Sequence, residues 1–409
     1  MAFVSLTDYE PIVGKQCIEE LYLLAEGLKG KRIKMVNSTA VGGGVAEILN
    51  RIIPLLNDLG ITTLWTVIKG GEDFFEVTKK IHNALHGEGL SFPPRMKEIF
   101  LEVSRENLRY IDLEQDVIVI HDPQPIVCIE SKDRTHAKWV WRCHIDISNP
   151  NEEVWDFLKG YVEHYDVALF SSPRFSKQLS IPQFLFFPSI DPLSDKNRDL
   201  EPEFINQVLD RFHIPQDKPI VTQISRFDRL KDPLGVIQAY RLAKRYTDCR
   251  LILAGGGASD DPEGELVLDE VRAEAKGDPD IHILSLLPTS SLEINALQRA
   301  STLILQKSIR EGFGLTVTEA LWKKKPTIGS AVGGIPAQII PNFTGALVHS
   351  IEGTAYQIRY LLSNPEIARK LGECGHEYVK EEFLITQALR RYLLLFHVLS
   401  HPGERIIFL

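Results

Sequence analysis

The sequence predicts an α/β protein built from two doubly wound domains. Short apolar runs alternate with segments whose apolar residues recur at helical spacing, which is typical of parallel sheets with right-handed crossovers. The alternation is interrupted once by PSIDPLSDKNRDLEP (188–202), where Pro, Asp and Ser dominate as in a linker. A chain of 409 residues is also too long for one typical domain.

The first domain, expected over 1–192, begins with an amphipathic helix in CIEELYLLAEGLKG that should end at Gly30. After the first strand, a VGGG loop at 41–44 precedes a helix over 45–60. Strands are expected in five runs: KRIKMVNSTA (31–40), ITTLWTVI (61–68), DVIVIHDPQP (116–125), KWVWRCHIDIS (138–148) and DVALFSS (166–172).

The second domain is expected over 193–380, and the residues 381–409 form a C-terminal helix that crosses back to the first domain. Its helices should run from Pro233 to about Tyr246, over 263–275 and over 290–299. A further helical segment is TVTEALWKKK (316–325). The strands are expected in PIVTQISRF (219–227), RLILAGGG (250–257), IHILSLL (281–287), STLILQKS (301–308) and PTIGSA (326–331).

The composition argues against several classes of protein. A net charge of −9 does not suit nucleic-acid binding, which needs a basic surface, and the run at 323–325 is better explained as a solvated helix end. The five cysteines are scattered without a CxxC pair, which favours reduced thiols over disulfides or a zinc site. No signal peptide and no apolar run of membrane-spanning length is recognised, so we expect a cytoplasmic protein without membrane contact.

Three glycine loops follow expected strands, at 42–44, 255–257 and 312–314. The first two do not complete a dinucleotide fingerprint, because Glu47 and Asp260 occupy the place of the third glycine, and no Walker A loop is present. Each loop could be a tight turn. All three, however, are expected at the carboxyl ends of strands, where backbone amides with a helix behind them bind phosphate.

In ISRFDRLKDP, the cations Arg226 and Lys231 lie between a strand and the helix that begins at Pro233. Helix N-termini favour anions over cations, so the placement makes sense if an anion lies between the two side chains. Together with amides of the Gly-Phe-Gly turn at 312–314, they predict a diphosphate site.

The stretches SRFDRLKDP and SIREGFGLTVTEA resemble the donor-binding elements of retaining GT-B glycosyltransferases. The resemblance implies the GT-B fold, with two Rossmann-like domains facing a central cleft. It implies that Glu311 meets the hydroxyls of the transferred sugar and that Glu319, after seven intervening residues, meets the nucleotide ribose. The donor-binding residues implied are Gly43, Gly44, Gly256, Gly312, Phe313, Gly314, Leu315, Thr316 and Glu319.

The N-terminal half adds NSTAVGGGVAE, HDPQP, WRCHIDISNPN and LFSSP, which together are similar to the trehalose glycosyltransferring synthases of glycosyltransferase family four. The resemblance places His144 by the donor sugar and Asp146 near the sugars. Their spacing puts both side chains on one face of a strand. His144 could instead be a buried core histidine and Asp146 a cap at the strand end, and His121 and Asp122 could be ordinary turn residues.

The expected function is therefore that of a retaining hexosyltransferase that makes trehalose from nucleoside-diphosphate-glucose and glucose. The residues expected to carry catalysis are Glu311, Arg226, Lys231, His144 and Asp146. No cofactor or protein-bound metal is required, although Mg²⁺ could assist through the diphosphate. The base of the nucleotide, the favoured direction and a homodimer are left open.

Two alternatives stay open: a related enzyme with another acceptor, such as a sugar phosphate, glycerate or glucan, and a sugar-nucleotide-binding homologue without turnover. The missing dinucleotide fingerprint disfavours an epimerase or dehydrogenase. One departure from the superfamily pattern concerns Gln338 and PNFTG (341–345), which replace a glutamate and an acidic-glycine turn. We expect this segment to flank the second layer of the donor domain and to leave the reaction class unchanged.

Overall fold

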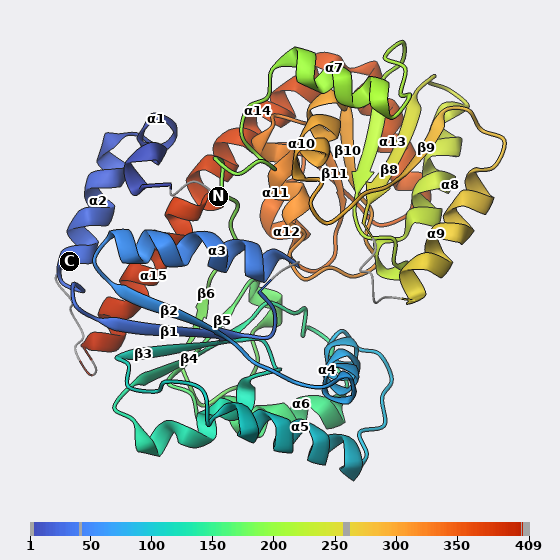
Figure 1. Ribbon diagram of the computed structural model, residues 1–409. Helices are drawn as coiled ribbons and strands as arrows, with labels where there is room; N and C mark the ends of the chain where they lie inside the picture. Colours follow the sequence, from blue (N-terminus) through green and yellow to red (C-terminus); the bar gives the residue numbers. More distant parts are fainter. Residues whose placement is uncertain (1–3, 41–42, 257–261, 402, 404–409) are drawn as a thin grey trace. The chain divides into compact units, whose positions relative to one another are not determined.

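The computed structural model, shown in Figure 1, describes residues 4–40, 43–256, 262–401 and 403. They form two compact units. The N-terminal unit extends to Ser189 and includes the chain from Ile385 onward, and the C-terminal unit is Ile190–Leu384. None of the helices in these stretches is long and apolar enough to cross a membrane.

The N-terminal unit contains a six-stranded parallel sheet with the strand order β2-β1-β3-β4-β5-β6. The chain reverses its direction across the sheet between β1 and β3, which is the kind of switch point where α/β proteins bind ligands. The strands are β1 (Arg32–Asn37), β2 (Thr62–Val67), β3 (Val117–His121), β4 (Lys138–Cys143), β5 (Val167–Phe170) and β6 (Gln183–Leu185).

Helices cover both faces of this sheet, with α3 and α15 on one face and α5 and α6 on the other (Figure 1). The last helix, α15, packs against α2 and α3 although it comes from the far end of the chain. The helices are η1 (Leu6–Tyr9), α1 (Glu10–Val13), α2 (Lys15–Glu26), α3 (Gly43–Asp58), α4 (Glu72–Leu85), α5 (Pro94–Asn107), η2 (Ile126–Arg134), α6 (Glu152–Val162), η3 (Pro173–Phe175) and α15 (Ile385–Ser400).

Two helix boundaries in this unit differ from the prediction. Helix α2 ends at Glu26, because the chain turns through Gly27 and reaches Gly30 with a positive φ of 79°. Helix α3 begins at Gly43, although its apolar pattern begins only at Val45. The amides of the first residues of a helix donate no intrahelical hydrogen bond, so glycines are tolerated there. Because glycine adds nothing to the apolar pattern of a helix, that pattern does not show where this helix begins.

The C-terminal unit repeats the architecture, with a six-stranded parallel sheet in the order β12-β11-β10-β7-β8-β9. Here the switch point lies between β7 and β10. The strands are β7 (Ile220–Ile224), β8 (Arg250–Gly255), β9 (Ile281–Ser285), β10 (Leu303–Gln306), β11 (Thr327–Ser330) and β12 (Ala346–Val348).

Successive strand residues of this sheet point to opposite faces and build two cores. Val221 packs in the core under α8, α9 and α13, while Ile220 packs in the core under α7 and α10. The helices are α7 (Pro202–Arg211), η4 (Arg229–Lys231), α8 (Pro233–Lys244), α9 (Pro262–Ala275), α10 (Ser291–Ala300), α11 (Leu315–Trp322), α12 (Ile335–Gln338), α13 (Ile351–Ser363) and α14 (Pro365–Glu382).

Candidate active site

The side chain of Glu311 is the centre of a polar cluster at the switch point of the C-terminal unit. Its Oε2 accepts hydrogen bonds from Nζ of Lys231 at 2.7 Å, Oγ of Ser308 at 3.1 Å and Nε2 of Gln306 at 3.3 Å. The side chains of Lys231 and Glu311 are only 15% and 10% exposed. Such an ion pair is stable in a largely buried place because additional hydrogen bonds satisfy the carboxylate.

A second set of contacts fixes the two loops that carry this ion pair. Gln223, in β7, donates from Nε2 to the carbonyl of Lys231 at 2.9 Å and accepts at Oε1 from the amide of Lys307, also at 2.9 Å. The side chain of Lys307 pairs with Asp232, which caps α8 by accepting from the amide of Gly235 at 3.1 Å. The loops after β7 and β10 are therefore joined by both backbone and side-chain contacts.

The Gly-Phe-Gly turn follows Glu311 and ends at the N-terminus of α11. Gly314 is the N-cap of α11 with a φ of 82°, and a Cβ atom there would lie 3.1 Å from Cγ of Glu311. The first amides of α11, at Leu315 and Thr316, have no acceptor within the helix, and the helix dipole favours an anion beside them. This end of α11 is therefore a place where a bound anion would be favoured.

Two further residues support the turn from behind. Gly333 has a φ of 55°, and a Cβ atom there would lie 1.7 Å from the backbone oxygen of Glu311. Gln338 is fully buried, donates to the carbonyl of Phe313 and accepts from the hydroxyl of Thr318. The segment around Gln338 thus lies behind the Gly-Phe-Gly turn, and the side-chain amide of Gln338 holds the backbone of that turn.

Glu319 lies on α11 itself and is only 3% exposed. Its Oε1 is 3.8 Å from Nζ of Lys196, and its backbone oxygen accepts from Nζ of Lys323 at 3.1 Å. Burial lowers the pKa of Lys323 to about 7. Of the two glutamates of the motif, Glu311 therefore lies in the loop before α11, whereas Glu319 lies on α11 itself.

Arg226 and the second glycine loop depart from the expected arrangement. The side chain of Arg226 is 60% exposed and pairs with Asp228 at 3.1 Å, so it lies outside the buried cluster around Glu311. A Cβ atom on Gly256 would lie 2.7 Å from the backbone oxygen of Leu286, which gives this glycine a packing role. Gly43 and Gly44 open α3 and do not form the expected loop, while Gly42 and Gly257 lie outside the described residues.

In the N-terminal unit, His121 and His144 form a stacked pair. Nδ1 of His121 lies 3.1 Å from Nε2 of His144, and the rings are 13° from parallel. The expectation that His144 and Asp146 lie on a strand is wrong, because β4 ends at Cys143. The amide of His144 donates to Oδ1 of Asp122 at 2.7 Å, so a side chain takes up the hydrogen bond at the point where the strand ends.

The surroundings of this pair shift its titration. Burial, with Arg142 as the second cause, lowers the pKa of His121 to about 3 and that of His144 well below its ordinary value. Burial raises the pKa of Asp122 to about 7, and Asp122 also has a positive φ of 63°. Asp146 is 6% exposed and accepts from the amide of Ser148 at 2.9 Å, so it does cap the turn after the strand.

Comparison with known proteins assigns the chain to a family. The family model described as "Trehalose synthase, N-terminal domain" matches residues 35–177, and "Glycosyl transferases group 1" matches 206–378. The chain is 45% identical to a trehalose synthase of Pyrococcus horikoshii, over 95% of both chains. It is 40% identical to a trehalose synthase of Rubrobacter xylanophilus, over 96% of both. The chain belongs to the trehalose synthase family.

The fold of this trehalose synthase family member is GT-B, as predicted. The sucrose-phosphate synthase structure of Thermosynechococcus elongatus aligns with a TM-score of 0.72 and 19% identity, over 90% of this chain and 99% of that one. The two family models match segments that lie within the N-terminal and C-terminal units respectively. The predicted resemblance to trehalose glycosyltransferring synthases is confirmed by the full-length relatives.

Several residues of the candidate site in this trehalose synthase family member were not singled out from the sequence. For His121 and Asp122 the sequence leaves open that they are ordinary turn residues, although a His-Asp pair at the end of an apolar run is a polar signal at the carboxyl end of a strand. Gln306 and Ser308 carry the same signal in LILQKS. Arg142 stands out as a charge within the buried run WVWRC.

Proposed function

We propose that this protein is a retaining glycosyltransferase that forms trehalose from a nucleoside-diphosphate-glucose and free glucose. The observation that carries the proposal is the Lys231–Glu311 pair beside the N-terminus of α11, within a chain that matches trehalose synthases over nearly its whole length. It combines a cation and helix amides suited to a diphosphate with a carboxylate suited to sugar hydroxyls.

The roles follow from the chemistry of each group. Lys231 and the amides of the Gly-Phe-Gly turn bind the diphosphate, and the exposed Arg226 closes over it from solvent. Glu311 accepts hydrogen bonds from hydroxyls of the transferred glucose, and Glu319 accepts from the ribose. In the N-terminal unit, His144 and Asp146 contact the sugars, and the start of α3 at Gly43 and Gly44 supplies further amides to the donor.

The reaction breaks the bond between the anomeric carbon and the diphosphate oxygen, and the electron pair leaves with the diphosphate. The acceptor hydroxyl forms the new bond on the same face of the sugar, and its proton passes to the departing phosphate oxygen. The positive charge of Lys231 and Arg226 stabilises that oxygen increasingly as negative charge develops on it. Excluding water from the donor prevents its hydrolysis.

The test is to incubate the purified protein with ADP-, UDP- or GDP-glucose and free glucose, and to identify the product by NMR. We expect an α,α-linked non-reducing disaccharide, and the reverse cleavage when trehalose and a nucleoside diphosphate are supplied. A parallel incubation with glucose 6-phosphate distinguishes a phosphorylated acceptor. Formation of only glucose 1-phosphate, a glucan or hydrolysed glucose would overturn the proposal.

A further inference from the structure

Arg142 is a buried cation beside the histidine pair, on the strand next to His121 and two residues before His144. It lies in β4 in register with His121 of β3 and is only 2% exposed. Nη1 of Arg142 donates to the hydroxyl of Tyr392 at 2.9 Å. The guanidinium carbon lies 5.5 Å from the ring centre of Phe186 and 5.4 Å from that of Tyr392. Its partners are therefore aromatic, and Tyr392 comes from α15 at the far end of the chain.

A charge in this position is costly unless something compensates it. Among the residues that the structure describes, no carboxylate forms an ion pair with Arg142, and its side chain contacts the aromatic faces of Phe186 and Tyr392 and the Tyr392 hydroxyl. Cation–π contacts and one hydrogen bond replace only part of the lost hydration. Since an apolar side chain of similar size would pack at this place without that cost, the retained charge points to a role beyond packing.

The field of Arg142 acts on three titratable groups. It lowers the pKa of His121 and of His144, in each case as the second cause after burial, and it opposes the rise that burial imposes on the pKa of Asp122. It therefore favours neutral imidazoles and an ionised carboxylate. Between Arg142 and His144 in the chain, burial raises the pKa of the Cys143 thiol well above its ordinary value, and the charges of Asp122, Asp146 and Lys177 act on that thiol as well.

These charge states are the ones that the observed contacts need. The amide of His144 donates to Asp122 Oδ1 at 2.7 Å, and an ionised carboxylate is the stronger acceptor. The contact between Nδ1 of His121 and Nε2 of His144 needs one donor and one acceptor. If both rings carried two protons, neither nitrogen could accept, and the pair would separate.

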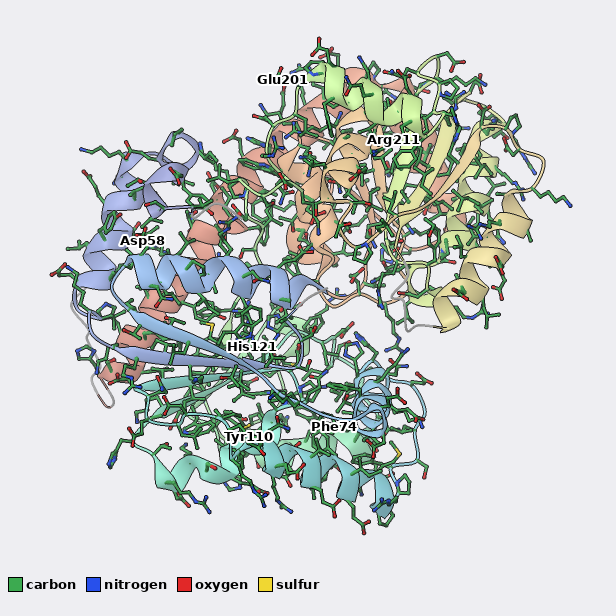
Figure 2. The ribbon with its side chains drawn as sticks, viewed as in Figure 1. Asp58, Phe74, Tyr110, His121, Glu201 and Arg211 are labelled. Carbon is green, nitrogen blue, oxygen red and sulfur yellow. The ribbon has the colours of Figure 1, made fainter. Side chains whose placement is uncertain are left out.

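We propose that Arg142, held by Tyr392 of α15, is a positioning residue that keeps His144 uncharged and correctly oriented through His121 and Asp122. His121, whose place in the N-terminal unit is labelled in Figure 2, is the intermediate member of this group. The inference rests on the proposed function, in which His144 contacts the donor sugar. Residues near the C-terminus thus control the charge of a site formed by β3 and β4.

The test compares three variants by the pH dependence of kcat/KM for disaccharide formation. Arg142→Met removes the charge at similar volume, and we expect the acidic limb of the profile to move up by about one pH unit, because both the carboxylate of Asp122 and the histidines then protonate more easily. Arg142→Lys keeps the charge and should keep the acidic limb. Tyr392→Phe keeps the ring but removes the acceptor, so it should lower kcat/KM at every pH without moving the limb.

Arg250→Met is the matched control. Arg250 is another buried arginine, 4% exposed, on β8 of the C-terminal unit, where it pairs with Asp217 and Asp280. Its loss should reduce stability and leave the acidic limb unmoved. An unmoved limb in Arg142→Met as well, or a limb moved by Arg142→Lys as far as by Arg142→Met, would overturn the proposal.

A measurement that does not depend on enzyme activity can test the role of Arg142 separately from the proposed function. The ring signals of His121 and His144 can be titrated by NMR in the wild type, Arg142→Lys and Tyr392→Phe, and in Arg142→Met if that variant folds. We expect both rings to stay neutral well below pH 6.5 in the wild type and in both conservative variants. Ordinary titration near pH 6.5 in the wild type would refute the role of Arg142. Depressed titration without any disaccharide would refute only the proposed function.

Discussion

The ammonium of Lys231 lies 2.7 Å from the carboxylate of Glu311, and this contact joins the loop after β7 to the loop after β10. It brings together the cation proposed for the diphosphate and the carboxylate proposed for the sugar. Preorganised charges of this kind need little rearrangement when negative charge develops on the leaving group. The ion pair is therefore important both for the stability of the fold and for the proposed reaction.

Lys231→Met should lower both stability and nucleotide affinity. Glu311 would keep the donors Ser308 and Gln306 but lose its only recorded cation among the described residues. We expect the free energy of unfolding to fall by about 1–3 kcal/mol, as for other buried polar groups that lose a partner. Urea unfolding and calorimetry with nucleoside diphosphates measure the two effects. The exposed Lys276→Met is the control, and unchanged diphosphate binding would contradict the assignment of Lys231.

Arg226→Ala should separate the effect on nucleotide affinity from the effect on stability, because the side chain of Arg226 is exposed. In its ion pair with Asp228 only the Arg226 side chain is exposed, at 60%, whereas the Asp228 side chain is 10% exposed and also accepts from the amide of Lys231, so we expect the loss of Arg226 to lower the free energy of unfolding by about 1 kcal/mol. Diphosphate affinity and turnover should nevertheless fall, by about 1.5–3 kcal/mol in the binding free energy, because a charge-assisted contact is lost. If calorimetry gives wild-type diphosphate affinity for this variant, Arg226 does not bind the donor.

Gly333→Ala should disrupt the site through the backbone. The new Cβ atom would lie 1.7 Å from the backbone oxygen of Glu311, in a residue whose φ is 55°, so the loop that carries Glu311 must move. Gly277→Ala is the matched control, because its φ of 88° imposes similar backbone strain and nothing lies within 4 Å of the new atom. We expect Gly277→Ala to cost about 1 kcal/mol with activity retained, whereas Gly333→Ala loses activity at least tenfold. Equal activity of the two variants would show that the contact with Glu311 is unimportant.

The sequence predicted the fold where an element has a continuous apolar pattern. The strands that end at His121 and Cys143 are such runs, and the sequence predicts both of them. Strands β6 and β12 have three residues each, too few to show a pattern, and they were missed. The end of β4 was also misplaced, because it depends on the carboxylate of Asp122, which is distant in sequence and accepts from the amide of His144.

In the candidate site, too, local sequence motifs point to individual residues, but the contacts between those residues depend on the fold. Glu311 and Lys231 belong to local motifs and were singled out, but their direct contact joins residues 80 positions apart and depends on the strand order. The contact between Arg142 and Tyr392 spans 250 positions and could not be inferred without the fold. Local chemistry was thus readable from the sequence, while the pairing of its parts was set by topology.

The histidine pair predicts an acid-sensitive fold. The pKa of His121 is about 3 in the folded protein because of burial and Arg142, whereas an unfolded histidine titrates near its ordinary value of 6.5. The unfolded state therefore binds more protons between these values, and the stabilisation is complete above pH 6.5 and is lost as pH falls toward 3. The depressed pKa of His144 acts in the same direction.

His121→Gln should reduce this dependence. One such group contributes a slope of about 1.4 kcal/mol per pH unit, so the free energy of unfolding should change less steeply between pH 6 and pH 4 in the variant by up to that amount. Urea unfolding at several pH values measures the slope. The exposed His136→Gln should keep the wild-type slope, and an unchanged slope in His121→Gln would mean that His121 is protonated in the folded protein.

The final prediction is that no carboxylate of the protein attacks the sugar, although configuration is retained. Retaining glycosidases place two carboxyl groups about 5 Å apart around the bond, one of them as nucleophile. Glu311 and Glu319 suggest such a pair in sequence, but Glu311 is engaged by Lys231 and two other donors, and Glu319 lies on α11 beyond the amides of its first turn. Asp146 is occupied in capping the turn at Ser148.

We therefore expect displacement on the front face, with the departing phosphate oxygen taking the proton of the acceptor hydroxyl. Glu311→Ala and Asp146→Ala should lose rate because the sugar is misplaced, and added azide or formate should not restore it, since there is no nucleophile to replace. The measurements are turnover of both variants with and without azide, and mass spectrometry of the wild type after incubation with a fluorinated donor. A covalent glycosyl-enzyme adduct, or a β-glycosyl azide formed by either variant, would establish a double displacement and refute this mechanism.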